Sequence, residues 1–437
     1  MNNKALIIVM DGLGDRPIAE FNRLTPLEKA HTPFFDKLVS KGLCAMVDPL
    51  TPGMPVSTHT GMALLMGLTA NDTAYLARGP VEAAGIDLVT QPGDVILRCN
   101  FAHIETVQDR LKVLDRRAGR INQDTRTLAQ ALNTIELPHN IKGTLYPTTQ
   151  HRAVLHLQGK NLSDKISDTD CSRNDPCYVQ TCMPLFDKGI NKLANNNSAI
   201  QTSDAVNQFI HQAHQILQTH PINKQRMEQG KIPATGILCR SAGQTNSLRN
   251  LLNYYKVKVA VISAEATVIG LSKLFGFTTI TRPSFTAMTD TDLDTKVKLA
   301  LEAMQDHDLV YLHIKGTDIC SHDHQAIQKK QFIEKIDMAL SDVDINDKMI
   351  AVTADHSTDT NTGFHSGDPV PSLLYSPSGR YDKCNSFSEQ ECMTGGLGRL
   401  SANSFLLTIL DQMGCLHNFK KEDIPYIEPI NIQTNLS

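Results

Sequence analysis

The sequence predicts an α/β fold in which a mostly parallel β-sheet is covered by helices on both faces. Short apolar runs rich in β-branched residues recur along the chain, as expected for strands buried on both faces of a parallel sheet. Amphipathic stretches of helical period lie between them, and this alternation is typical of a parallel sheet with packed helices. The strand-like runs are residues 5–10, 257–262, 309–314 and 349–353, and the helical stretches include 205–217 and 295–304.

A change of pattern in the middle of the chain predicts a second, inserted domain. From about residue 78 to 197 the strand-like runs become shorter, as at 95–101 and 153–157, and turn residues are more frequent. The asparagine-rich segment 191–197 is interpreted as a linker. We therefore expect a discontinuous core domain, residues 1–75 and 200–437, and a smaller α+β domain at 76–199.

Composition and charge exclude several function classes. The chain has 437 residues, 41% hydrophobic and 20% charged, with a net charge of −4, so nonspecific nucleic-acid or anionic-membrane binding is not expected. The apolar run near the N-terminus ends at Asp11 and is too short for a membrane span or a signal peptide. We expect a cytoplasmic enzyme with reduced thiols, because the ten cysteines include no CxxC pair. Its oligomeric state is not predicted.

Residues of metal-ligand type follow three of the predicted strands. Asp11 follows the first strand, Asp318 and His322 follow residues 309–314, and Asp355 and His356 follow residues 349–353. A further histidine, His365, comes nine residues after His356 in a glycine-containing loop. Ligands of open α/β sheets bind at the carboxyl ends of the strands, so these side chains can converge on one edge.

Such a set of carboxylates and imidazoles suits Zn²⁺, Mn²⁺ or similar ions, and two such ions can clamp a transferring phosphoryl group. A single Asp-His pair is more often an ordinary loop or a satisfied polar pair. Asp323 and His324 are equally eligible by local pattern, so the residues alone leave the choice between His322 and His324 open.

A hydroxyl group for nucleophilic attack precedes a helix-like apolar run. Ser57 and Thr58 lie just before residues 62–66. There a hydroxyl would lie at the positive end of the helix dipole and could bind a metal that lowers its pKa. The alternative interpretation is an ordinary N-cap.

Arginines concentrate in the expected inserted domain. Guanidinium groups suit bidentate binding of phosphate or carboxylate, although arginine clusters are more often solvated surface. The candidates for binding a small anionic substrate are Arg98, Arg116, Arg117, Arg120 and Arg152.

Motifs along nearly the whole chain resemble archaeal-type cofactor-independent phosphoglycerate mutases, which belong to the alkaline phosphatase superfamily. The opening Asp-Gly-Leu-Gly-Asp-Arg-Pro at residues 11–17 and the closing Gly-Gly-Leu-Gly-Arg at 395–399 are especially specific. The other matching segments are residues 25–30, 32–33, 78–83, 93–101, 115–121, 151–154, 220–223, 313–316, 355–358 and 365–371.

This resemblance implies an alkaline-phosphatase-like core and two divalent metal ions. Mn²⁺ is expected first, with Mg²⁺, Zn²⁺ or Co²⁺ as alternatives. One ion would be held by Asp318, His322 and His365, which favours His322 over His324. The implied ligands of the other ion are Asp11, Thr58, Asp355 and His356. The arginines of the inserted domain and Lys315 would bind the substrate.

Counting along the family's Pro-Gly-Ser-Asp-Thr-Ala-His pattern places Thr58 at the position of its nucleophilic serine. The flanks Pro52 and Gly67 align with it without a gap. His59 stands where the family has aspartate, and Met62 stands where it has histidine. The implied reaction is interconversion of 3-phosphoglycerate and 2-phosphoglycerate through a phosphothreonine.

Two alternative functions follow from the same residues. The altered segment 57–62 motivates a metal-dependent phosphotransferase or phosphatase acting on another small phosphorylated metabolite. A metal-binding regulatory protein without catalysis is the third hypothesis.

Overall fold

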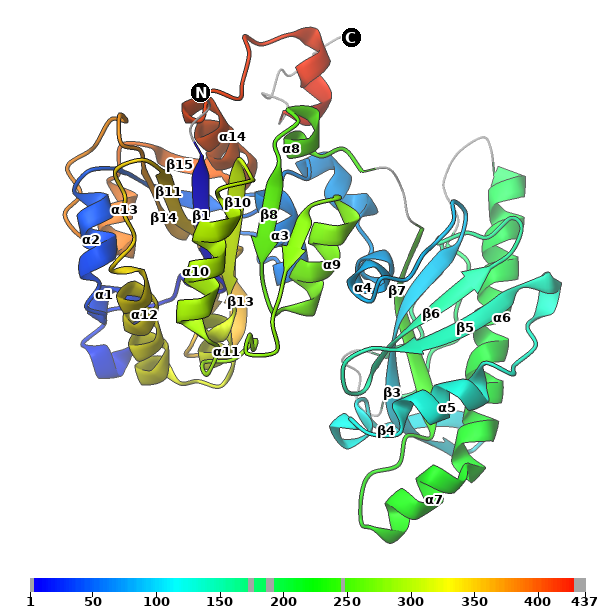
Figure 1. The fold of residues 1–437 in the computed structure, drawn as a ribbon. Coiled ribbons are helices and arrows are strands. Elements are labelled where there is room, and N and C mark those ends of the chain that lie inside the picture. The colour runs from blue at the N-terminus through cyan, green and yellow to red at the C-terminus, as the bar shows by residue number, and fades with distance from the viewer. Residues whose placement is uncertain (1–3, 172–176, 186–191, 245–247, 428–437) are drawn as a thin grey trace. The chain divides into compact units, whose positions relative to one another are not determined.

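The computed structural model describes residues 4–171, 177–185, 192–244 and 248–427. The chain forms two units: unit 1 comprises Met1–Ala74 and Leu248–Ser437, and unit 2 comprises Tyr75–Ser247 (Figure 1). Among the described residues, no helix has the length and apolar character needed to cross a membrane.

Unit 1 is built on an eight-stranded sheet with β1 near its middle. Five of its seven neighbouring strand pairs are parallel, which confirms the mostly parallel sheet. In spatial order the strands are β15 (Gly398–Ser401), β2 (Leu43–Asp48), β14 (Val370–Tyr375), β11 (Met349–Thr353), β1 (Ala5–Met10), β10 (Leu309–Ile314), β8 (Val259–Ile262) and β9 (Thr278–Ile280).

Helices cover both faces of this sheet, as expected from the sequence. Leu6 and Ile8 of β1 belong to a core that includes Phe35 of α2 and Phe332 of α12. On the opposite face, the Tyr311 hydroxyl of β10 donates to a carbonyl of α3. The helices are α1 (Pro26–Lys29), α2 (Pro33–Val39), α3 (Thr58–Leu65), α8 (Leu251–Tyr254), α9 (Ala266–Leu274), α10 (Leu293–Ala303), α11 (Gly316–His322), α12 (Ala326–Leu340), α13 (Glu389–Met393) and α14 (Ala402–Gln412).

A two-stranded hairpin follows β11 and contributes to the site described below. It consists of β12 (Ser357–Asp359) and β13 (Phe364–Ser366), and Thr358 pairs with His365 in its antiparallel register.

Unit 2 has an antiparallel five-stranded sheet centred on the long strand β3. The sheet residues Phe101 and Leu155 share a core with Phe209 and Leu217 of α6, which gives this unit its α+β character. Its elements are α4 (Arg78–Gly85), β3 (Val95–Val107), β4 (Arg110–Asp115), α5 (Thr125–Leu132), β5 (Lys142–Pro147), β6 (Arg152–Gln158), α6 (Lys192–Thr219), α7 (Pro221–Glu228) and β7 (Gly236–Gln244).

Three features of unit 2 differ from the sequence-based expectations. Unit 2 continues to Ser247, beyond the expected boundary at 199, because β7 pairs with β3 and α6 packs on that sheet. The expected linker at 191–197 is wrong from residue 192 onward, where α6 begins; Asn191 lies outside the described residues. Cys171 and Cys177 form a disulfide, so the expectation of reduced thiols does not hold for this pair.

Candidate metal centre

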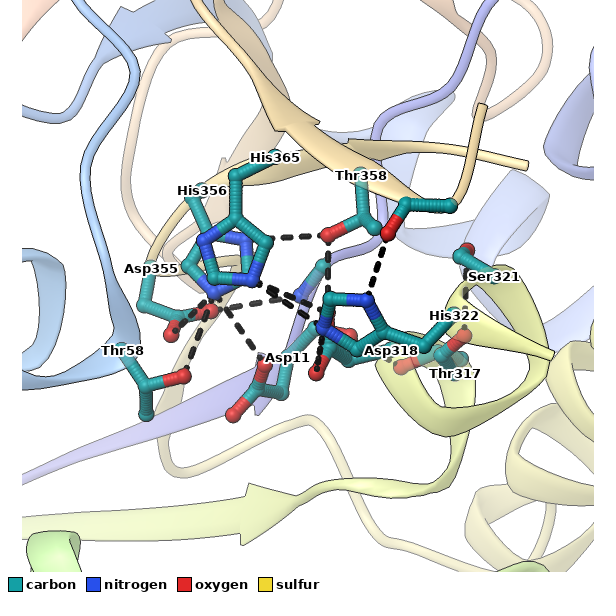
Figure 2. Close-up of polar contacts among 12 residues, drawn as sticks. Asp11, Thr58, Thr317, Asp318, Ser321, His322, Asp355, His356, Thr358 and His365 are labelled. Carbon is teal, nitrogen blue, oxygen red and sulfur yellow. Dashed lines mark hydrogen bonds and ion pairs between the residues drawn. The ribbon is translucent and has the colours of Figure 1, made fainter. Parts of the chain in front are cut away.

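Three adjacent strands of unit 1 deliver carboxylates to one edge of the sheet. β1 lies between β10 and β11 and runs parallel to both, so their carboxyl ends meet. Asp11 follows β1, Asp318 lies in the first turn of α11 after β10, and Asp355 follows β11. All three side chains are buried and face one another (Figure 2).

The turn after Asp11 requires glycine. Gly12 has a φ of +65°, and a Cβ atom there would lie 2.6 Å from the Thr358 hydroxyl and 2.8 Å from Asp318 Oδ1. The Gly12 amide also donates to Asp355 Oδ1 at 3.2 Å. The absence of a side chain therefore lets the chain bring three carboxylates together.

Asp318, His322 and His365 form one group of metal-ligand type, with their ligand atoms within 4.8 Å of one another. Asp318 and His322 are four residues apart in α11 and thus share a helix face, while His365 comes from β13. Asp318 Oδ2 lies 3.3 Å from His322 Nε2, and Asp318 Oδ1 lies 3.6 Å from His365 Nε2.

The two imidazoles of this group are oriented by the backbone. His322 Nδ1 lies 2.7 Å from the Gly363 carbonyl, and His365 Nδ1 lies 2.7 Å from the Val56 carbonyl. When neutral, each ring therefore carries its proton on Nδ1 and its lone pair on Nε2. The two Nε2 atoms face each other at 3.2 Å, an arrangement that a bound cation would stabilise.

Asp11, Asp355 and His356 form a second group, again with ligand atoms within 4.8 Å. His356 Nε2 lies 3.2 Å from Asp355 Oδ2 and 3.5 Å from Asp11 Oδ1. Burial, together with the charge of Asp355, raises the pKa of Asp11. Two carboxylates at such short range need a nearby positive charge.

Lys315 supplies part of that charge. Its Nζ lies 2.9 Å from Asp11 Oδ1 and 2.6 Å from Asp318 Oδ2. Burial opposes its ionisation, but the surrounding carboxylates outweigh burial and raise the Lys315 pKa. One ammonium does not balance three carboxylates. The remaining positive charge comes from protonated imidazoles, since Asp318 raises the pKa of His322 and Asp355 raises that of His356 against burial, or from bound cations that replace those protons.

Two buried oxygen atoms support a fit to bound cations. Asp318 Oδ2 and Asp355 Oδ2 are buried and face cationic groups: Lys315 Nζ lies 2.6 Å from the first, and His356 Nε2 lies 3.2 Å from the second. Buried carboxylate oxygens of this kind, beside imidazole lone pairs, are suitable ligands for divalent ions.

Thr58 is the first residue of α3 and lies against the second group. Its Oγ1 lies 3.2 Å from His356 Nε2 and accepts a hydrogen bond from Lys315 Nζ at 3.0 Å. Ser57 is the N-cap residue, one position outside the helix. Thus the Thr58 hydroxyl lies at the positive end of α3 beside the candidate ligands (Figure 2).

His324 and His322 contact different backbone carbonyls. His324 Nδ1 lies 3.0 Å from the Thr360 carbonyl, and this residue belongs to neither ligand group. Asp323 is the exposed C-cap residue of α11. α11 thus places His322, and not His324, on the face of Asp318.

Sequence reasoning missed two residues of this centre. His313 Nε2 lies 3.0 Å from Asp11 Oδ2, and the Thr358 hydroxyl donates to Asp318 Oδ1 at 2.8 Å. His313 left a signal, because it is a polar residue inside an apolar strand with both faces buried. Thr358 left none, since only the hairpin register directs it inward.

Four of the five predicted arginines of unit 2 lie near His151. Burial and then the charges of Arg152, Arg117, Arg98 and Arg120 lower the pKa of His151 to about 4. Arg98 is itself buried and pairs with Glu82 at 2.8 Å. The region is therefore strongly positive.

Arg116, the remaining predicted arginine, donates to Asp170 Oδ2 at 2.5 Å. The sequence interpretation missed Arg78 and Arg240, whose charges act on Arg98 and, after burial, help to lower the Arg98 pKa to about 10. These two residues come from α4 and β7, outside the arginine-rich segment.

Comparison with known proteins finds relatives that share one name and match this chain over nearly its whole length. Residues 3–413 match the family model of the metalloenzyme superfamily. A 2,3-bisphosphoglycerate-independent phosphoglycerate mutase of Methanosphaera stadtmanae is 35% identical over 95% of this chain and 99% of its own length. A second such mutase, from Archaeoglobus fulgidus, is 37% identical, again over 95% of this chain and 99% of the relative.

Solved structures have the same fold. A protein from Pyrococcus horikoshii has a TM-score of 0.80 at 30% identity and covers 96% of this chain and 100% of its own. The cofactor-independent phosphoglycerate mutase of Thermoplasma acidophilum has a TM-score of 0.66 at 28% identity, covering 94% and 99%. Within the metalloenzyme superfamily, the chain belongs to the family of 2,3-bisphosphoglycerate-independent phosphoglycerate mutases.

Proposed function

We propose that this protein interconverts 3-phosphoglycerate and 2-phosphoglycerate by transferring the phosphoryl group to and from Thr58. The observation that carries the proposal is the position of the Thr58 hydroxyl. It lies at the start of α3 beside His356 and Lys315, next to two groups of metal-ligand type. Family membership supplies the substrate class, because the relatives are named phosphoglycerate mutases.

Two divalent cations complete the proposed centre. Asp318, His322 and His365 would hold one, and the other would be held by Asp11, Thr58, Asp355 and His356. When bound, such ions lower the pKa of a ligating hydroxyl and neutralise charge on the phosphoryl oxygens. Mn²⁺ is our first expectation for their identity, and Mg²⁺, Zn²⁺ and Co²⁺ are alternatives with similar ligand preferences.

The proposed reaction consists of two in-line displacements at phosphorus. Thr58 Oγ1 forms a bond to phosphorus, and the bond to the substrate's C3 oxygen breaks as that oxygen regains a proton. The C2 hydroxyl of the same glycerate attacks the phosphothreonine in the second step, which returns the Thr58 hydroxyl. Lys315 would hold a hydrogen bond to Thr58 Oγ1 or to the attached phosphoryl group.

The arginines of unit 2 are the proposed contacts of the substrate's carboxylate and hydroxyl groups. The positive charges of Arg117, Arg120 and Arg152 contribute to lowering the pKa of His151, which supports a shared positive region around that residue. Arg98 and Arg116 have acidic partners in Glu82 and Asp170, so we assign them mainly to orienting that region.

A second candidate function is phosphoryl transfer from a different small phosphorylated metabolite. His59 and Met62, the two departures from the family pattern, are both buried in α3, one and four residues after Thr58. They alter the surroundings of the nucleophile without removing a candidate ligand.

A coupled assay separates these functions. Mn²⁺-loaded protein is given 3-phosphoglycerate without 2,3-bisphosphoglycerate, and 2-phosphoglycerate is followed through enolase. We expect rapid conversion that a chelator abolishes. No conversion, together with metal-dependent phosphate release from another ester, would instead establish the second candidate.

A further inference from the structure

Three cysteines and an aspartate of unit 1 cluster away from the candidate metal centre. Cys44 lies in β2, Cys392 in α13, and Asp382 and Cys384 in the loop that follows β14. The sulfur atoms of Cys44 and Cys384 and a carboxylate oxygen of Asp382 lie within 4.8 Å of one another. The Cys392 thiol is hydrogen-bonded to that of Cys44, which together with burial raises the Cys44 pKa, and it also donates to the Ser372 carbonyl at 3.6 Å. A third sulfur therefore lies beside this three-residue group, next to Cys44.

The cluster is buried and held by the backbone. Cys44 and Cys392 are fully buried, and Cys384 is only 5% exposed. The Asp382 carboxylate accepts hydrogen bonds from the amides of Cys44 and Gly396, both at 2.7 Å, and of Cys384 at 3.0 Å. Because three separate chain segments are tied to one carboxylate, the site is organised by interactions other than those among the sulfur atoms.

A glycine allows the last segment to approach. A Cβ atom on Gly395 would lie 2.2 Å from the Cys44 carbonyl oxygen, and the Leu397 amide donates to the same carbonyl at 3.1 Å. The loop after α13 therefore closes directly over Cys44. The Gly-Gly-Leu-Gly-Arg motif thus has a local structural role beside this cluster, in addition to its value for recognising the family.

We infer that Cys44, Cys384, Cys392 and Asp382 form a structural binding site for a thiophilic divalent cation, with Zn²⁺ as the best chemical match. Thiolates select Zn²⁺ over Mg²⁺ and Mn²⁺, and four protein ligands leave no open position for substrate, which is typical of structural sites. The ion would join β2, α13 and the loop between β14 and α13. Binding would release the thiol protons to solvent.

Cobalt provides a specific probe of this site in the full-length protein. The protein is stripped with a chelator under reducing conditions and reloaded with Co²⁺. Cobalt bound to thiolates gives an intense ligand-to-metal charge-transfer absorption, whereas the carboxylates and imidazoles of the other centre do not. We expect this absorption in the wild type, with one equivalent of Zn²⁺ abolishing it.

Matched variants assign the signal to the cluster. Cys384→Ser should lose the absorption and one equivalent of tightly bound Zn²⁺, while Cys415→Ser, outside the cluster, should keep both. Asp318→Asn should also keep the absorption, because it alters only the other centre. If Cys384→Ser does not fold, Cys392→Ala serves as the second test at a different ligand.

Two results would overturn the inference. One is a wild-type protein that shows no thiolate-to-cobalt absorption although its thiols titrate as reduced. The other is a disulfide between Cys44 and either Cys384 or Cys392 in protein that is purified without reductant and that binds no zinc.

Discussion

The carboxylate–imidazole centre of unit 1 and the arginine region of unit 2 are assembled in different ways. The centre uses residues at the ends of adjacent parallel strands, and Asp11, Asp355 and His356 have no exposed surface. The arginine region uses long side chains, of which Arg117 and Arg120 are exposed. We infer that the first region is built for fixed geometry during bond making, and the second for adaptable binding of an anion.

Removal of the nucleophile gives the largest expected effect. It tests whether the centre of unit 1 is the place where the phosphoryl bond is made. Thr58→Ala should lower kcat by roughly 10⁴–10⁶-fold, because the covalent route is lost. Ser57→Ala should stay within about 3-fold of wild type, since Ser57 lies outside the proposed ligand set. Loss of turnover in Ser57→Ala but not in Thr58→Ala would transfer the nucleophilic role to Ser57. Enolase-coupled turnover and metal content measure both variants.

A comparison of two histidines sharpens the ligand assignment. His322→Ala should lower kcat by more than about 100-fold and reduce metal content, since losing a ligand should exceed the typical cost of losing its hydrogen-bond partner. His324→Ala should keep the metal content of the wild type, because His324 contacts the Thr360 carbonyl instead. Equal metal loss in both variants would contradict the assignment. Elemental analysis beside steady-state kinetics provides the measurement.

The arginine region should respond mainly in KM. Arg117→Ala or Arg120→Ala should raise KM by about 10–100-fold, the equivalent of one charge-assisted hydrogen bond, and leave metal content unchanged. Arg126→Ala, an exposed arginine on α5, is the matched control and should have little effect. An unchanged KM in both Arg117→Ala and Arg120→Ala would contradict the proposal that the arginine region binds the substrate. Initial rates over a range of 3-phosphoglycerate concentrations test it.

The smallest expected effect concerns a carboxyl group of unit 1 outside the two ligand groups. Glu389 accepts hydrogen bonds from the Asp15 amide and the Thr25 hydroxyl, and burial raises its pKa from 4.5 to about 7. A carboxyl group with a raised folded-state pKa costs stability once the unfolded chain ionises, so its penalty is absent below pH 4.5 and complete above pH 7.

Wild type should therefore lose on the order of 1–3 kcal/mol of unfolding free energy through Glu389 across that pH range. Glu389→Gln should remove this part of the pH dependence, as judged by urea unfolding at several pH values. The same slope in both proteins would show that Glu389 does not cause it.

Much of the centre could be predicted because strands and ligands coincide in the sequence. Asp11 and Asp355 follow apolar runs whose composition marks them as buried parallel strands, and parallel strands bring their carboxyl ends together. These inferences need only local periodicity and the direction of the strands. The preference for His322 over His324 comes instead from the family resemblance, and α11 places His322 on the face of Asp318.

The remainder depends on long-range pairing that local patterns do not encode. Thr358 faces Asp318 only because β12 pairs with β13, and unit 2 extends to Ser247 only because β7 pairs with β3. The asparagine run after residue 192 lies at the start of α6, since tertiary packing of the later part of that helix overrides low helix propensity. Arg240 joins the arginine region through the same β7 pairing.

The most direct test of the central claim is the location of the phosphoryl group on the enzyme. Mn²⁺-loaded protein would be mixed with 2-phosphoglycerate, quenched in denaturant within the first turnover, digested and analysed by tandem mass spectrometry. We predict phosphate on Thr58, and none in protein treated with a chelator. Phosphate on Ser57, or mutase turnover with no phosphorylated residue at any quench time, would contradict the account.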